Sequence, residues 1–128
     1  MSYFLAKTLT GSFEDAVQWT TEALAREGFG VITQIDVKET FRKKLDIDFR
    51  NYRILGACNP SYAHEAIQIE DKIGTMLPCN VVVQETAADV IEVAAVDPVA
   101  SMMAIDNPRL KAMAGHIRDK LRRAIESL

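Results

Sequence analysis

Hydrophobic residues recur along the chain with two spacings, and each spacing predicts a different kind of element. In the segment 29–37, apolar and polar residues alternate, which places Phe29, Val31, Ile35 and Val37 on one face, as in a half-buried strand. In the C-terminal segment from 108, apolar residues recur three or four positions apart, which is typical of an amphipathic helix. The predicted elements, in order, are strand 3–9, helix 13–26, strand 29–37, short helix 38–45, strand 52–58, helix 60–69, strand 79–85, strand 90–96 and a helix from 108.

Residues that start and stop helices support these boundaries. Ser12 with Asp15 three residues later forms a capping-box pattern, and Gly28 supplies a left-handed stop. Asn-Pro pairs, at 59–60 and 107–108, place an N-cap before a proline in the first turn. The resulting order is strand, helix, strand, short helix, strand, helix, strand, strand, helix. It predicts an α+β fold with a mainly antiparallel sheet covered by helices on one face.

The composition is that of one globular domain spanning residues 1–128. The chain is 48% hydrophobic and 26% charged, with two cysteines, so it is neither disordered nor a disulfide scaffold. A net charge of −3 argues against a nucleic-acid partner, and no apolar run is long enough to span a membrane. Without an export signal, the two cysteines are expected to be free thiols in the cytoplasm.

The candidate chemistry is concentrated in two similar motifs, Gly56-Ala57-Cys58-Asn59-Pro60 and Leu77-Pro78-Cys79-Asn80. If their strands are antiparallel neighbours, the end of one lies beside the start of the next, and the two Cys-Asn pairs meet. Cys58 then precedes a helix N-terminus, which favours a thiolate and can hold an anion, while Cys79 serves as a resolving thiol. The alternative is that both cysteines are small buried hydrophobic residues and both asparagines are caps.

Three other candidates are weaker. Cys58, Cys79 and His64 are metal-ligand types, but they lack the paired spacing of a zinc site, so no metal ligands are assigned. Glu92 shares a strand face with Val90, and it is either a buried ionisable group or a solvated position on an edge strand. Serine-nucleophile and phosphate-loop motifs are absent from the sequence.

Four motifs resemble the domain-of-unknown-function 302 family, and they occur in order: GFGV, ILGACNP, LPCNVVV and VDP. The resemblance runs from about Phe13 to Leu121. It implies a fold similar to the TATA-binding-protein-like class, with a curved antiparallel sheet, and a homodimer. The family brings no established activity and no known cofactor. Its motifs nominate as a shared site Cys58, Asn59, Pro60, Pro78, Cys79 and Asn80. The sequence departs from the family at the turn 87–89, where a glycine is expected.

Taken together, the residues and the resemblance favour a protein of unknown function that binds a small molecule or anion, or performs thiol redox chemistry, at the two Cys-Asn pairs. Whether it is an enzyme stays open. One alternative is a non-enzymatic homodimeric interaction module with structural cysteines, whose interface is the sheet or the segment holding Met102 and Met103. A second alternative is a metal-binding protein.

Overall fold

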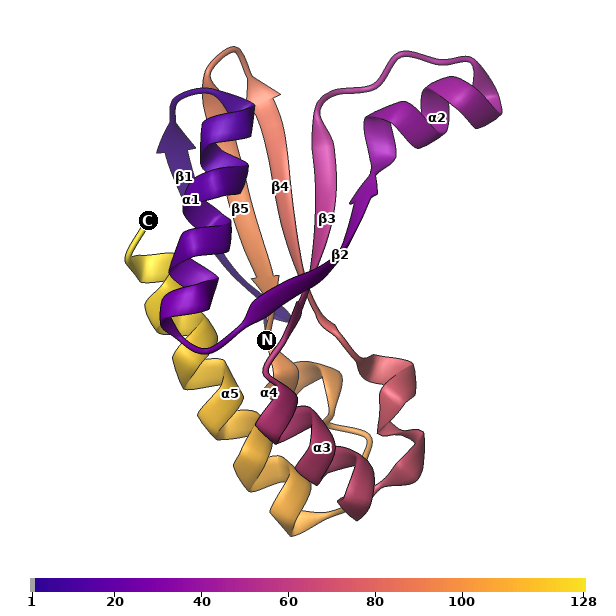
Figure 1. Cartoon of the computed structure of the whole chain (residues 1–128), viewed down its shortest axis with the longest axis vertical. Helices are drawn as coiled ribbons and strands as arrows, with labels where there is room; N and C mark the ends of the chain where they lie inside the picture. Colours follow the sequence, from indigo (N-terminus) through magenta and orange to yellow (C-terminus); the bar gives the residue numbers. More distant parts are fainter. Residues whose placement is uncertain (1) are drawn as a thin grey trace.

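A computed structural model describes residues 2–128 and shows a single five-stranded antiparallel sheet with helices on one side (Figure 1). The strand order is β1-β5-β4-β3-β2, and every neighbouring pair is antiparallel. The elements along the chain are β1 (Phe4–Thr10), α1 (Phe13–Arg26), β2 (Gly30–Asp36), α2 (Val37–Leu45), β3 (Tyr52–Cys58), α3 (Pro60–Ile69), the 3-10 helix η1 (Asp71–Met76), β4 (Cys79–Ala87), β5 (Val90–Val96), α4 (Pro98–Ser101) and α5 (Pro108–Glu126). The α+β class and the element order match the prediction, with η1 and α4 as additions.

Helices α1 and α5 cover one face of the sheet and form the core with it. The predicted cap is present, since the Ser12 side chain accepts a hydrogen bond from the Asp15 amide at 3.1 Å. Alternate residues of the central strands point into this core, among them Leu55, Val81, Val83, Ile91 and Val93, none of which is exposed to solvent. The opposite face carries the other half of each strand, and no helix within the described residues 2–128 packs over it in Figure 1. We call this uncovered side the open face.

Strand β2 corrects one prediction made from the alternating pattern. Its register against β3 shifts between Val31 and Thr33, which is a β-bulge. Val31 pairs with buried Ala57 on the covered face, whereas Ile35 pairs with Ile54 and is 51% exposed. The extra residue therefore moves Ile35 to the open face, and the predicted single apolar face of this strand is wrong.

The β4–β5 hairpin forms without the glycine expected at its turn. Asp89 takes the left-handed conformation there, with a φ of 59°, which aspartate tolerates better than most residues. Its carbonyl accepts a hydrogen bond from the Gly11 amide at 3.0 Å, which ties the turn to the β1–α1 connection. A register shift between Glu85 and Ala87 accommodates the short turn. The hairpin also places β5 between β1 and β4, so β5 is not the edge strand that the sequence suggested for Glu92.

The lower end of the sheet in Figure 1 is enclosed by α3, η1, α4 and the first half of α5. Buried Asp97 caps α4 through the Val99 amide, and its carboxylate lies 3.0 Å from Arg118 of α5. These contacts hold the C-terminal helix against the end of the sheet where both Cys-Asn motifs lie. None of the helices in residues 2–128 is long and apolar enough to cross a membrane.

Candidate functional site

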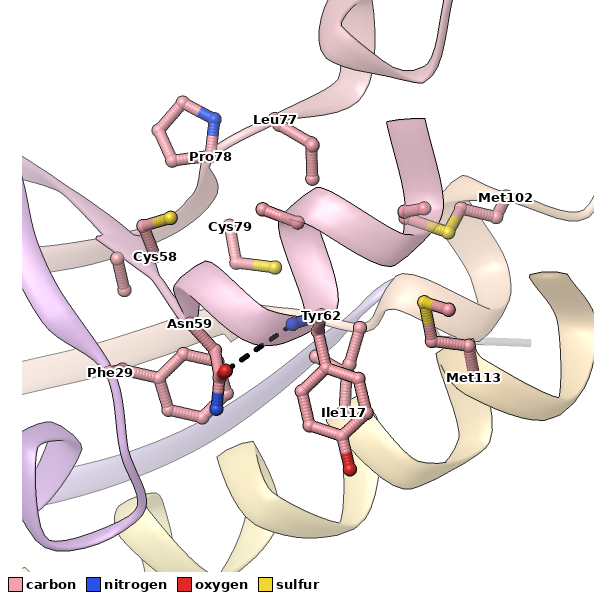
Figure 2. Close-up of a pocket in the computed structure, with 13 residues that line it drawn as sticks. Phe29, Cys58, Asn59, Tyr62, Leu77, Pro78, Cys79, Met102, Met113 and Ile117 are labelled. Carbon is pink, nitrogen blue, oxygen red and sulfur yellow. Dashed lines mark hydrogen bonds between the residues drawn. The ribbon is translucent and has the colours of Figure 1, made fainter. Parts of the chain in front are cut away.

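The two cysteines meet at the end of the sheet, as their motifs predicted. In the register of β3 against β4, Ala57 lies opposite Cys79, so Cys58 and Cys79 are one position apart on adjacent strands. Both are free thiols, and both line one small cavity between the sheet, α3 and α5 (Figure 2). Asn59 and Pro78 line the same cavity. Four of the six nominated residues are thus brought together.

Local sequence explains why the chain turns as it does here. The Asn59 side chain caps α3 by accepting from the Tyr62 amide at 3.5 Å, and Pro60 occupies the first helical turn. Gly56 permits a close approach, because a Cβ there would lie 2.0 Å from Thr33 Oγ1 and 2.7 Å from Pro78 Cγ. The Leu77–Pro78 peptide is cis and leads directly into β4. Pro60 itself is exposed and does not line the cavity.

Burial controls the chemistry of the inner thiol. Cys79 is only 6% exposed, and burial, with a smaller contribution from nearby Cys58, raises its pKa from 9.0 to about 11. Cys79 is therefore a neutral thiol at physiological pH and a poor nucleophile. Cys58 is half-buried at the start of α3, so it is the more accessible of the two thiols.

The cavity is too small for an organic ligand in this conformation. Its volume is about 30 Å³, which corresponds to one or two water molecules. Its walls are largely apolar, and besides the two cysteines they include the thioethers of Met102 and Met113. His64 is exposed on α3, and residues 2–128 contain no cluster of three or more His, Cys, Asp or Glu side chains that could hold a metal ion. The grouping of Cys58, Cys79 and His64 is therefore not assembled.

Asn80, the sixth nominated residue, lies elsewhere. It follows Cys79 in β4, so its side chain points to the opposite face of the sheet, where it lines a larger hollow of about 350 Å³ on the open face. The hollow is bordered by Tyr3, Phe4, Tyr52, Asn80, Gln84 and Glu92 and has an apolar floor that includes Val82, Ala94 and Val96. Only Asn80 was nominated at this site, although Glu92 had been noted on an unassigned strand face.

A hydrogen-bonded row of polar side chains crosses this hollow. Gln84 accepts from Arg50 Nε at 2.9 Å and donates to Glu92 Oε1 at 3.2 Å. Glu92 is half-buried, and within residues 2–128 no cation lies within ion-pair distance of its carboxylate. The carboxylate thus remains available to a positively charged group entering the hollow. The sequence signal was the alternation in β4 and β5, which puts Val82, Gln84 and Glu92 on the face without a helix.

Fold and cavities together define a small α+β protein with an antiparallel sheet that is covered on one side only. Residues 5–128 match the family model of the Domain of unknown function DUF302, so the chain belongs to this family. A crystal structure of an uncharacterized conserved DUF302 protein from Bacillus stearothermophilus is similar, with a TM-score of 0.90 and 25% sequence identity over 98% of each chain. A search of curated proteins gave no match. The resemblance stated from the four motifs is confirmed.

Proposed function

We propose that this protein binds a small amphipathic molecule carrying a cationic group, and that it does so in the hollow of the open sheet face. The observation that carries the proposal is the half-buried Glu92 carboxylate at one end of an otherwise largely apolar hollow of about 350 Å³. That volume falls within the range of small-molecule sites, which typically combine apolar walls with a few placed polar groups. The cysteine cavity, at about 30 Å³, offers no comparable space.

The polar row supports a defined orientation of such a ligand. Gln84 is fixed by its bonds to Arg50 and Glu92, so its amide cannot rotate freely. Arg50 lies over the rings of Phe49 and Tyr52, with its Cζ 4.4 Å and 5.6 Å from the two ring centroids. It forms the end of the polar row opposite Glu92. A ligand cation is expected at Glu92, and its apolar part is expected over Val82 and Ala94.

The test compares an amine with the corresponding alcohol: hexylamine with hexanol, and tryptamine with tryptophol. Binding of each probe is measured by NMR chemical-shift titration. The amines are expected to perturb the amides of β4 and β5 and to bind more tightly than the alcohols. Glu92→Gln should reduce amine affinity about fivefold, the effect of one partly exposed ion pair of about 1 kcal/mol, and should leave alcohol binding unchanged. Asp119→Asn, an exposed position on α5, is the control and should alter neither. If Glu92→Gln bound the amines as tightly as Asp119→Asn does, the proposal would be contradicted.

A second candidate, a homodimer through the same face, has its own supporting observation. One apolar row crosses all five strands of the open face through the paired residues Ala6, Ala94, Val82, Ile54 and Ile35. Two copies can pack their open faces together about a two-fold axis that runs parallel to the strands and passes over β4. This arrangement would place β5 of one copy over β3 of the other. Glu92 in β5 would then lie toward Arg50, which precedes β3, of the second copy. Charge is therefore complementary for two identical faces. In the segment expected as the other possible interface, Met102 is 3% exposed and Met103 is 54% exposed, so Met103 is the more accessible of the two side chains.

Light scattering coupled to gel filtration separates the two candidates. A homodimer through this face predicts twice the chain mass at micromolar concentration and a monomer for Val82→Arg. A wild-type protein that is monomeric at all concentrations refutes the homodimer and leaves the hollow open to a small ligand.

A further inference from the structure

Four sulfur-containing side chains line the small cavity on the covered side of the sheet. They are Cys58 at the end of β3, Cys79 at the start of β4, Met102 directly after α4, and Met113 in α5. The first and last of these positions, Cys58 and Met113, are far apart in the sequence, and the fold brings all four to one void of about 30 Å³. In the view of Figure 2, the Cys79 sulfur lies between that of Cys58 and those of the two methionines.

The other walls of this cavity exclude most competing ligand types. They are built mainly from apolar residues such as Phe29, Leu77 and Ile117, and its polar asparagine, Asn59, already caps α3. Among residues 2–128, no carboxylate or imidazole lines the cavity. Hard cations require oxygen ligands, and zinc sites draw on thiolate, imidazole and carboxylate, whereas thiolate and thioether together select cuprous copper.

We propose that this cavity binds one monovalent soft metal ion, Cu(I), through the sulfurs of Cys58, Cys79, Met102 and Met113. Binding replaces the thiol proton of each coordinating cysteine by the metal and releases that proton to solvent, with no change in oxidation state. With both cysteines bound as thiolates, the site with one Cu(I) carries a net charge of −1, and the half-buried position of Cys58 keeps part of that charge within reach of water. The void accommodates a single ion, and the long flexible methionine side chains adjust to it.

Burial and access fit this role. Cys79, Met102 and Met113 are 6%, 3% and 5% exposed, which shields a bound Cu(I) from water and oxygen. Cys58 is half-buried and gives the ion a route from solvent to the inner thiol. This site lies on the covered side of the sheet, so it is independent of the ligand proposed for the open face.

The experiment is an anaerobic titration of the reduced full-length protein with Cu(I) against the chromophoric chelator bathocuproine disulfonate. We expect one Cu(I) per chain, weakened at least a hundredfold in Cys79→Ser and about tenfold in Met113→Leu. Met103→Leu is the matched control, because Met103 neighbours Met102 but is 54% exposed, and it should bind as the wild type does. Leucine replaces methionine with little change of volume, so both methionine variants are expected to fold.

Thermal unfolding with and without one equivalent of Cu(I) checks folding and binding together. Because a ligand that binds only the folded state raises its stability, Tm should increase for the wild type and Met103→Leu and should increase less for Met113→Leu. Failure of the wild type to take up one Cu(I) in the presence of the chelator would overturn the proposal. So would identical affinities in Met113→Leu and Met103→Leu, since the thioether would then contribute nothing.

Discussion

The buried thiol of Cys79 makes the stability of this protein depend on pH in the alkaline range. Its pKa is raised from 9.0 to about 11 in the folded state, first by burial and then by Cys58. Between pH 9 and about pH 11, the thiol of Cys79 loses its proton in the unfolded chain but keeps it in the folded chain. The stabilisation is therefore fully present below pH 9 and is lost as pH rises toward 11. Two pKa units correspond to roughly 3 kcal/mol in total, of which about 2 kcal/mol is lost between pH 8 and pH 10.5.

Urea unfolding at pH 8 and pH 10.5 measures this loss. Lysine and tyrosine residues also titrate in this range, so the informative quantity is the difference between the wild type and Cys79→Ala. The wild type should lose about 2 kcal/mol more than Cys79→Ala over the interval, whatever the absolute stability of the variant. Cys58→Ala is the control and should retain most of the dependence, because burial is the main cause of the shift. An equal loss in the wild type and Cys79→Ala would refute the reasoning.

Three further predictions concern the structure around the cavities, and urea unfolding at pH 7 checks each of them. Asn59→Ala removes the cap of α3 and should cost about 1 kcal/mol, and a neutral result would show that the cap contributes nothing. Gly56→Ala should cost about 3 kcal/mol by driving a methyl group into Thr33 and Pro78, and the added change Thr33→Ala should recover part of the loss. Leu121→Ala should also cost about 3 kcal/mol, because Leu121 is fully buried in the core, and a loss below 1 kcal/mol would contradict that placement.

Most of the fold could be predicted because its elements carry strong local signals. The Asn-Pro pairs at 59–60 and 107–108 begin α3 and α5, and alternation identified β5 with its observed bounds. The short 3-10 helix Asp71–Met76 and the four-residue helix α4 were missed, since neither is long enough to show a hydrophobic period. The faces of β2 were misassigned because a β-bulge reverses the alternation, and nothing in the composition of Ile32 or Thr33 marks it.

The candidate site was predicted in part, because antiparallel pairing alone brings the ends of β3 and β4 together. The thioethers of Met102 and Met113 could not be assigned to it, since their approach depends on how α4 and α5 pack across the end of the sheet. Tyr3, Tyr52 and Gln84 were also missed, because the open-face hollow arises from four separate strands and from Tyr3, which precedes β1. Such sites depend on tertiary packing, which the spacing of hydrophobic residues along the sequence does not reveal.

Strand geometry also explains why the two Cys-Asn pairs, alike in sequence, are divided differently between the two sides of the sheet. Cys79 and Asn80 are consecutive residues inside β4, so their side chains point to opposite faces, the thiol to the small cavity and the amide to the hollow. Cys58 is the last residue of β3, and Asn59 has left the strand to cap α3, so alternation no longer separates them and both line the cavity. A pair inside a strand therefore contributes to two sites, whereas a pair at a strand end contributes to one. Asn80 therefore lines the same hollow as Glu92 and Gln84, and under the function proposed for that hollow, substitutions at Asn80 should alter ligand binding there while leaving the chemistry of both thiols unchanged.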